Sequence, residues 1–136
     1  MPFVIAVLKV GTLSTELLIA ISNMKISSTV ETVDNLIDRA LAYHNQSQLD
    51  QAEELYQQVL NLDPENSKVL NLLGYLYHQT GNNELAMELI GQAIFIDPEQ
   101  AYFYKTAGKI YYAVRNFTDA VDAFRQSIDL EDVWKV

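Results

Sequence analysis

Residues 70–98 have the sequence LNLLGYLYHQTGNNELAMELIGQAIFIDP, and the architecture of the whole chain can be inferred from them. Apolar residues in this stretch recur at helical rather than alternating spacing, which predicts α-helix on both sides of one polar break. The break is Thr80-Gly81-Asn82-Asn83, where Gly81 can adopt the positive φ that ends a helix. The second helix must end before Asp97-Pro98, because proline cannot continue a helix and forces the preceding residue out of the α region. Two helices joined by a tight turn follow.

This unit recurs along the chain every 34 residues. Pro64 precedes Pro98 by 34 residues, and Asp132 follows it by 34. Further columns with the same spacing are Ala52, Ala86 and Ala120, and Tyr43, Tyr77 and Tyr111. Such a period is the signature of a repeat architecture. The expected helices span residues 33–45, 49–62, 67–80, 83–96, 101–114 and 117–130.

Small residues also keep their column. Ala40, Gly74 and Gly108 stand at one position of the three first helices. A glycine inside a helix costs about 0.5–1 kcal/mol relative to alanine, so two glycines in one column indicate that paired helices approach closely there. We therefore interpret these residues as structural.

With these columns in view, the chain resembles the tetratricopeptide repeat family. That family's 34-residue pattern has a large residue, then L-G-x2-Y, then A-x3-F and a final proline. The first unit departs from the pattern at Arg39, and the third has Asp132 in place of the proline. The second unit matches best, with Leu70, Leu73-Gly74, Tyr77, Ala86, Ile90 and Pro98.

The resemblance implies an all-α fold, a right-handed solenoid of three helix-turn-helix repeats. The repeats would occupy residues 33–66, 67–100 and 101–132, after an N-terminal extra segment at 1–32 and before a short tail at 133–136. It further implies a concave groove that holds an extended peptide or a partner helix. No catalysis comes with this fold, so we expect a protein that is not an enzyme and uses no cofactor.

In this family the groove is usually lined by the second, fifth, ninth, twelfth and thirteenth positions of each repeat, which share one helix face. Carried over, the resemblance nominates as groove residues Ile37, Leu41, His44, Lys68, Asn71, Tyr75, His78, Tyr102, Lys105, Lys109 and Tyr112. The same positions also include Asp34, Asn45, Gln79 and Ala113. We call all fifteen the groove set.

The charge of the groove set differs from that of the rest of the chain. Its three lysines and Asp34 contribute +2 to a total of −9, so the remaining residues carry −11. Lysine stems bury apolar length while their ammonium groups stay available, and tyrosines add broad contact area at little entropic cost. We therefore predict a partner segment that is acidic or carboxylate-ended and has an aromatic or aliphatic anchor.

The groove interpretation has one alternative and one specialised form. The lysines could be ordinary solubilising residues, with Tyr102 or Tyr112 packed on a neighbouring repeat. Repeats that hold chaperone C-termini resemble one another in a carboxylate clamp with lysine and asparagine at the fifth and ninth positions of the first unit. Ile37 and Leu41 stand there instead, so chaperone tails are not the predicted ligands.

Other function classes are disfavoured. The excess of 18 acidic over 9 basic residues repels nucleic acid and anionic membranes. The chain has no cysteine, and it lacks a phosphate loop and the zinc and serine hydrolase motifs. His44 and His78 share a column, which places them roughly 9–10 Å apart, too far to share a metal ion. We predict no metal site.

The two ends leave alternatives open. Residues 3–21 are mostly apolar, but Lys9 and Glu16 interrupt them and no positive charge precedes them, which favours a capping helix or a poorly ordered piece over a signal or anchor. Cytoplasm is the default localisation, with export as the alternative. At the other end, Val121, Phe124 and Ile128 have little cover unless Trp134 folds back. This predicts either a homodimer through the third repeat or a chain that continues into further repeats.

The function expected from the sequence is therefore a protein-interaction scaffold. One alternative is a secretion or assembly chaperone for client subunits. Another is the N-terminal repeat part of a larger glycosyltransferase-like protein, because the second unit is similar in style to repeats that precede such catalytic domains.

Overall fold

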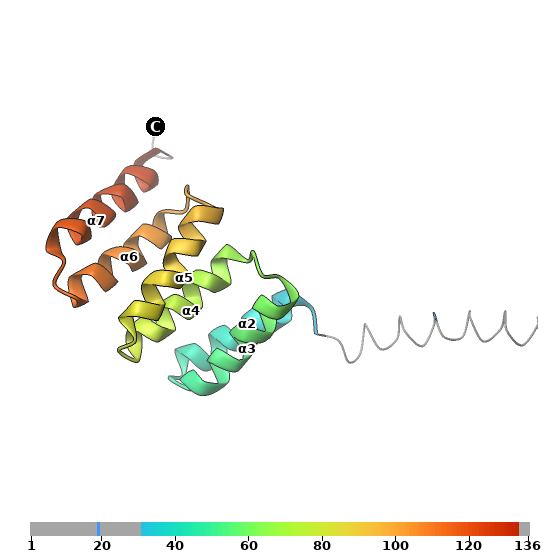
Figure 1. The fold of residues 1–136 in the computed structure, drawn as a ribbon. Coiled ribbons are helices and arrows are strands. Elements are labelled where there is room, and N and C mark those ends of the chain that lie inside the picture. Colours follow the sequence, from blue (N-terminus) through green and yellow to red (C-terminus); the bar gives the residue numbers. More distant parts are fainter. Residues whose placement is uncertain (1–18, 20–30, 134–136) are drawn as a thin grey trace, which may run out of the picture. The chain divides into compact units, whose positions relative to one another are not determined.

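The structure is a computed structural model, and it describes residue 19 and residues 31–133. The only regular secondary structure in residues 33–132 is α-helix, and the helices are joined by short turns (Figure 1). In chain order these are α2 (Val33–Asn45), α3 (Leu49–Leu62), α4 (Ser67–Gln79), α5 (Asn83–Ile96), α6 (Ala101–Ala113) and α7 (Phe117–Asp132). The expectation of a capping helix or signal within residues 1–30 concerns residues that, apart from Ile19, are not described. The expectation for Trp134 also lies outside the described residues.

The helices pair as the sequence predicted. α2 packs on α3, α4 on α5 and α6 on α7, and each pair then stacks on the next through α3 with α4 and α5 with α6. Within residues 33–136, the first pair lies at one end and the third pair at the other (Figure 1). The prediction of an all-α solenoid of helical repeats is confirmed.

The second and third repeats approach each other more closely through their first helices than through their second helices. α4 and α6 contact each other across the repeat boundary, whereas no two second helices in residues 31–133 make a contact of comparable extent. A stack whose first helices are closer together curves toward them. The inner side of this array is therefore lined by α2, α4 and α6.

One turn geometry closes every pair. Ser47, Gly81 and Arg115 share a column, and all three adopt positive φ, at 59°, 88° and 65°. In each turn the following amide donates back to the tyrosine carbonyl five residues earlier, as Asn82 does to Tyr77 at 2.9 Å. This bond completes a Schellman-type helix end. The prediction of positive φ at Gly81 is confirmed, and Ser47 and Arg115 adopt the same conformation without glycine's freedom.

The repeat boundaries follow the Asp-Pro pairs. α3 ends immediately before Asp63 and α5 immediately before Asp97, as predicted. α7 instead runs to Asp132, two residues beyond its predicted end, because the third repeat has no proline to stop it. α4 and α6 each end one residue earlier than predicted.

The alanine column and two large aromatic side chains lie at the centre of the packing. Ala52 and Ala86 are fully buried and Ala120 nearly so, while Tyr56 and Phe103 are among the largest fully buried side chains. Their close packing explains why the period is so visible in the sequence, since a core position has the same neighbours in every repeat.

Two of the chain's glycines differ sharply in the space around them. A Cβ on Gly74 would lie 2.9 Å from Cδ1 of the fully buried Ile90 and 3.2 Å from the carbonyl oxygen of Ala86. A Cβ on Gly91 would meet no atom within 4 Å. The interpretation that Gly74 permits close helix approach is therefore confirmed, and Gly91 has no such role.

This contrast gives a matched pair of substitutions. Gly91→Ala is expected to raise the free energy of unfolding by about 0.5–1 kcal/mol, because alanine restricts the unfolded chain and has room in the folded one. Gly74→Ala is expected to lower it by about 1–3 kcal/mol, because the core cannot accommodate the methyl group. Urea denaturation of the two variants measures both effects, and equal effects would contradict this description of the packing.

Candidate functional site

The inner side of the array carries a row of aromatic, histidine and lysine side chains that crosses all three repeats. His44 comes from α2, Tyr75 and His78 from α4, and Lys109 from α6. The Tyr75 ring is central to the row. Its centroid lies 5.9 Å from that of His44 and 6.1 Å from that of His78, and Nζ of Lys109 lies 5.2 Å from it. The structure therefore brings three residues of the groove set together around a fourth, Tyr75.

His44 is held in place by two hydrogen bonds. Its Nδ1 lies 3.0 Å from the hydroxyl of Tyr56, and its Nε2 pairs with Oε1 of Gln79. Burial raises the pKa of Tyr56 to about 12, so its hydroxyl keeps its proton at neutral pH. An amide oxygen can only accept, so Nε2 of His44 donates to Oε1 of Gln79. The imidazole thereby links the first and second repeats at the inner side.

His78 and Lys109 are fixed to different degrees. Nδ1 of His78 pairs with Oδ1 of Asn83 at 2.7 Å, across the turn between α4 and α5. Lys109 is exposed, and its ammonium group over the Tyr75 ring forms a cation–π contact that contributes about 0.5–1 kcal/mol at such a site. An anionic group arriving here meets a lysine that is already oriented by an aromatic ring.

Two more tyrosines of the groove set are partly exposed on α6. Tyr102 is 40% exposed and Tyr112 is 64% exposed. Burial and then the negative charge of Asp97 raise the pKa of Tyr102, so its hydroxyl remains a donor at neutral pH. Both rings pack edge-on within the third repeat, Tyr102 on Phe103 and Tyr112 on Phe117. They do not pack on a neighbouring repeat in these contacts, which leaves their outer faces accessible.

Three residues of the groove set lie in the core or against it. Ile37 is 6% exposed within the first core cluster, and Leu41 packs against the same cluster. Asn71 is 4% exposed, and its amide oxygen has no hydrogen-bond partner. Ile37 and Asn71 both occupy the fifth position, which is buried in the first two repeats but exposed at Lys105 in the third. These two side chains therefore offer a partner little surface.

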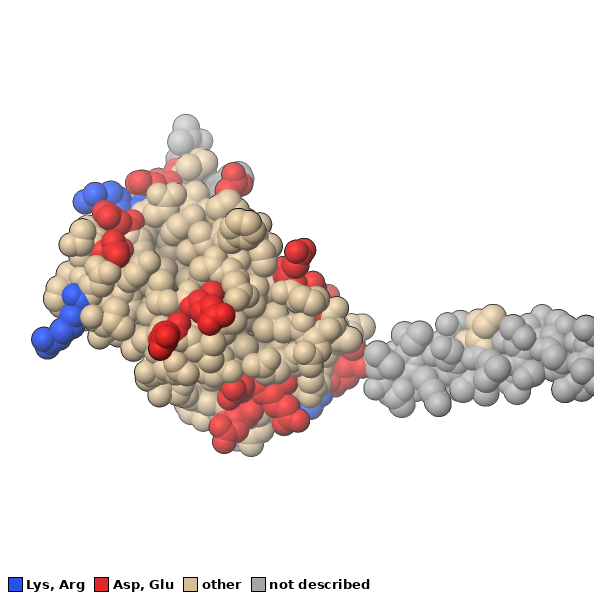
Figure 2. Space-filling view, in the orientation of Figure 1, with Lys and Arg blue, Asp and Glu red and all other residues tan. Residues whose placement is uncertain are grey.

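The remaining positions offer mostly exposed side chains. Lys68 and Lys105 are exposed, as are Asp34, Asn45 and Gln79. Figure 2 shows a face of the array on which acidic side chains predominate over α3 and α5, with only scattered basic ones. A locally basic groove set on an acidic body is consistent with this distribution.

The part of the chain that the structure describes contains neither a candidate metal site nor a candidate membrane span. In residue 19 and residues 31–133, no three histidine or carboxylate side chains converge as a metal ion would require. No helix in that part of the chain is long and apolar enough to cross a bilayer.

Sequence reasoning missed a hollow formed by α5, α6 and α7. Its volume is about 390 Å³. A signal was present in the repeat columns, because Ala107 and Ala123 stand where the preceding repeat has Leu73 and Leu89. Such a loss of size in a core column predicts a cavity.

Comparison with known proteins gives one family and several related folds. The family described as tetratricopeptide repeat matches residues 43–110, which is half of the chain. No curated protein matches the sequence. Among solved structures, a mutant O-GlcNAc transferase of Thermobaculum terrenum is 26% identical with a TM-score of 0.71. The Sgt2 repeat domain from Aspergillus fumigatus is 24% identical with a TM-score of 0.69.

A third structure is the first repeat domain of Spaghetti (RPAP3), bound to the HSP90 peptide SRMEEVD. It is 18% identical with a TM-score of 0.69. The matches cover 72%, 73% and 73% of this chain in the order given. The chain in turn spans 19% of the transferase, 66% of the Sgt2 domain and 79% of the Spaghetti domain.

Proposed function

Because this chain belongs to the tetratricopeptide repeat family, we propose that it is a non-enzymatic scaffold that holds an extended segment of a partner protein along its inner side. A protein-interaction role in general is what family membership and the related folds support. The observation that carries the finer proposal is the row of His44, Tyr75, His78 and Lys109, which contact one another across three repeats.

The chemistry of this row favours an acidic partner with an aromatic or aliphatic anchor. Lys68, Lys105 and Lys109 are exposed, and a bound carboxylate would lie next to ammonium groups on an otherwise acidic protein. The exposed faces of the Tyr102 and Tyr112 rings suit an apolar anchor of the partner. Their hydroxyls would form hydrogen bonds with the partner's backbone next to that anchor. Ile37 and Leu41 belong to the core, so a carboxylate clamp on α2 has no residues to form it.

A panel of fluorescent peptides tests this function. We expect the acidic, aromatic peptide Asp-Glu-Phe-Glu-Leu-Asp to bind more tightly than its counterpart with lysine at every acidic position. The peptide SRMEEVD, which the Spaghetti domain holds, should also bind more weakly, because this chain lacks the clamp. Affinity purification followed by mass spectrometry would then identify the natural partner, and recovery of one stoichiometric subunit would favour the chaperone alternative.

A second candidate function rests on the transferase neighbour. This chain could act as the repeat part of a glycosyltransferase-like protein, since 72% of it superimposes on 19% of that enzyme. Mass spectrometry of the protein from its natural source separates the two candidates. A mass near 15.4 kDa favours the scaffold, and a much larger protein with sugar-transfer activity favours the alternative.

We also propose that the outer face of α7 mediates a homodimer. Phe117, Val121 and Ile128 are 53%, 52% and 56% exposed, and among the described helices only α6 packs extensively on α7. In the two earlier repeats the same three columns are half-buried beneath the next first helix. The third repeat thus exposes an apolar stripe at positions that are partly covered in the first two repeats.

The other end of the array argues against head-to-tail stacking of copies. The columns with which α4 covers α3, including Val69, Leu73 and Leu76, are occupied on α2 by Asn35, Arg39 and Ala42, all exposed. α2 therefore lacks an apolar face for a neighbour's α7. In the proposed dimer two α7 helices pair in antiparallel orientation, which brings Arg115 of one copy toward the acidic end of α7 in the other.

Charge placed in the stripe should break this dimer. Val121→Glu is expected to convert a dimer to a monomer in light scattering at about 100 µM, because a buried unpaired carboxylate is costly at an interface. Glutamate suits the fold, since Glu53 stands in the same column of the first repeat. Leu62→Glu, at a position 62% exposed on α3, is the matched control and should leave the mass unchanged. A wild-type protein that is monomeric at this concentration would contradict the proposal.

A further inference from the structure

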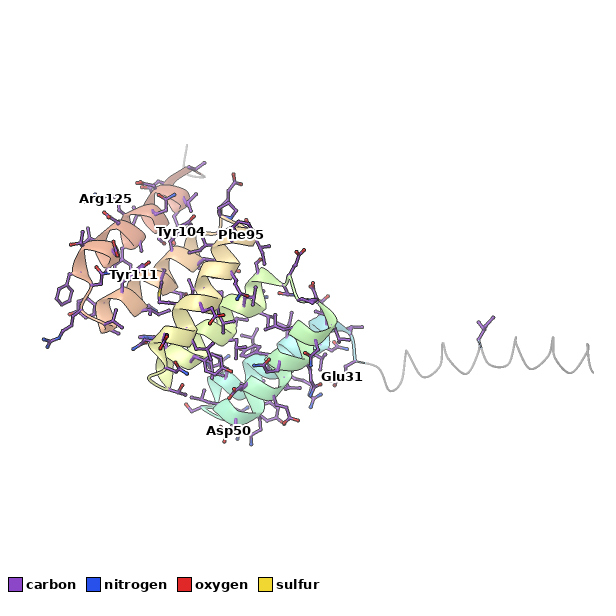
Figure 3. The ribbon with its side chains drawn as sticks, viewed as in Figure 1. Glu31, Asp50, Phe95, Tyr104, Tyr111 and Arg125 are labelled. Carbon is purple, nitrogen blue, oxygen red and sulfur yellow. The ribbon has the colours of Figure 1, made fainter. Side chains whose placement is uncertain are left out.

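The hollow between α5, α6 and α7 is a site that the proposed function does not use. Its floor is formed by Ile90, Ala107 and Ala123, which are 0%, 3% and 8% exposed. Tyr104 and Tyr111, labelled on α6 in Figure 3, line it as well. At about 390 Å³ it falls within the size range of ligand pockets. The nominated groove residues do not line it, so it is separate from the groove.

The chain's own repeats explain why the hollow is there. At the junction of the first and second repeats, the corresponding positions hold Gln57, Leu73 and Leu89. Leu73 is 1% exposed and Leu89 packs against the core there. At the next junction these positions hold Gly91, Ala107 and Ala123. Three reductions in size around one space open it without changing the path of the helices.

The rim of the hollow has the opposite charge from the groove. Asp119 and Asp122 line it from α7, and no lysine or arginine lines it. Asp119 accepts a hydrogen bond from the Asn116 amide at 2.6 Å, and Asp122 lies 4.0 Å from the exposed guanidinium of Arg125. An ion pair so exposed contributes little and does not block the rim. The Tyr104 hydroxyl donates to the carbonyl of Pro98 at 2.8 Å, so its proton is already engaged outside the two aspartates.

From this geometry we propose that the hollow binds a basic-aromatic segment of a partner protein, with the aromatic side chain inside and a neighbouring lysine or arginine against the two aspartates. The apolar floor accommodates the ring. The carboxylates at the rim select the cation and exclude an acidic neighbour. The groove and the hollow would then recognise segments of opposite charge.

The probe for this site is the peptide acetyl-Gly-Phe-Lys-Gly-amide, added to the full chain and followed by methyl and amide NMR. We expect saturable shifts of Ala107, Ala123 and Gly91 in the millimolar range. The peptides with Glu in place of Lys, or Ala in place of Phe, should bind roughly tenfold more weakly, because each loses one of the two recognised groups. Equal shifts with the Glu peptide would overturn the charge assignment.

Substitutions that copy the neighbouring junction test the location. Ala123→Leu and Gly91→Gln fill the hollow with the residues found one repeat earlier, and both should abolish the shifts at α6 and α7. Gly91 is exposed, so Gly91→Gln folds even where Ala123→Leu does not. Asp122→Asn should weaken binding roughly three- to tenfold, whereas Asp129→Asn on the same helix should not change it. Undiminished binding to both filled variants would refute the site, whatever the groove is found to bind.

Discussion

Phe103→Ala is expected to lower the free energy of unfolding by about 3–5 kcal/mol, enough to unfold much of the protein at 37 °C. Phe103 is fully buried on α6 and forms a cluster with Leu70 of α4 and Ala93 of α5. Its ring therefore joins the second repeat to the third. Removing it leaves a cavity that these helices cannot close without moving the whole third repeat.

The matched control is Phe95→Ala, which makes the same chemical change at a position that is 89% exposed. Its effect should stay within about 0.5 kcal/mol. Thermal unfolding followed by circular dichroism, with urea titration for the free energies, measures both variants. Similar losses for the two phenylalanines would mean that the third repeat does not pack as described.

Reversing two charges on α6 is expected to have the largest effect on binding. Lys105→Glu combined with Lys109→Glu should weaken the acidic peptide Asp-Glu-Phe-Glu-Leu-Asp roughly 10- to 100-fold at physiological salt. Both lysines are exposed, and Lys109 lies over the Tyr75 ring in the middle of the row. The substitution changes the local charge by four units and leaves the core untouched.

Arg125→Glu is the control for a general change in charge. Arg125 is exposed on α7, away from the inner side, and makes only a long pair with Asp122. This variant should bind the peptide within about twofold of wild type, since charges farther apart than a Debye length are largely screened. Fluorescence anisotropy measures both affinities. A double lysine variant that binds as wild type does would remove the inner side as the binding surface.

The fold was predictable from the sequence because its information is repeated. Most helix boundaries depend on a turn column, present in three copies, or on an Asp-Pro pair, present in two, and the recurrence averages out the departures. The exception is instructive: α7 extends to Asp132 because a stop signal is absent from the third copy alone. Recurring columns therefore predict the helices well, whereas a feature that differs between repeats occurs once and is harder to recognise.

The site was less predictable for the same reason. The family positions place Tyr75 and Lys109 near each other, but they also nominated Ile37 and Asn71, which the structure buries. Its position in the repeat fixes the direction in which a side chain leaves the helix axis. Whether that direction faces solvent depends on the neighbouring helix pair. The hydrogen bonds of His44 to Tyr56 and Gln79 join residues 12 and 35 positions away, and no local pattern indicates them.

The central claim is that the inner side of α4 and α6 receives the partner. Amide NMR of the labelled chain during titration with Asp-Glu-Phe-Glu-Leu-Asp tests it directly. We expect saturable shifts that centre on Tyr75, Lys105, Lys109 and Tyr112. Shifts confined to α5 and α7, or the same shifts with the lysine-substituted peptide, would contradict it.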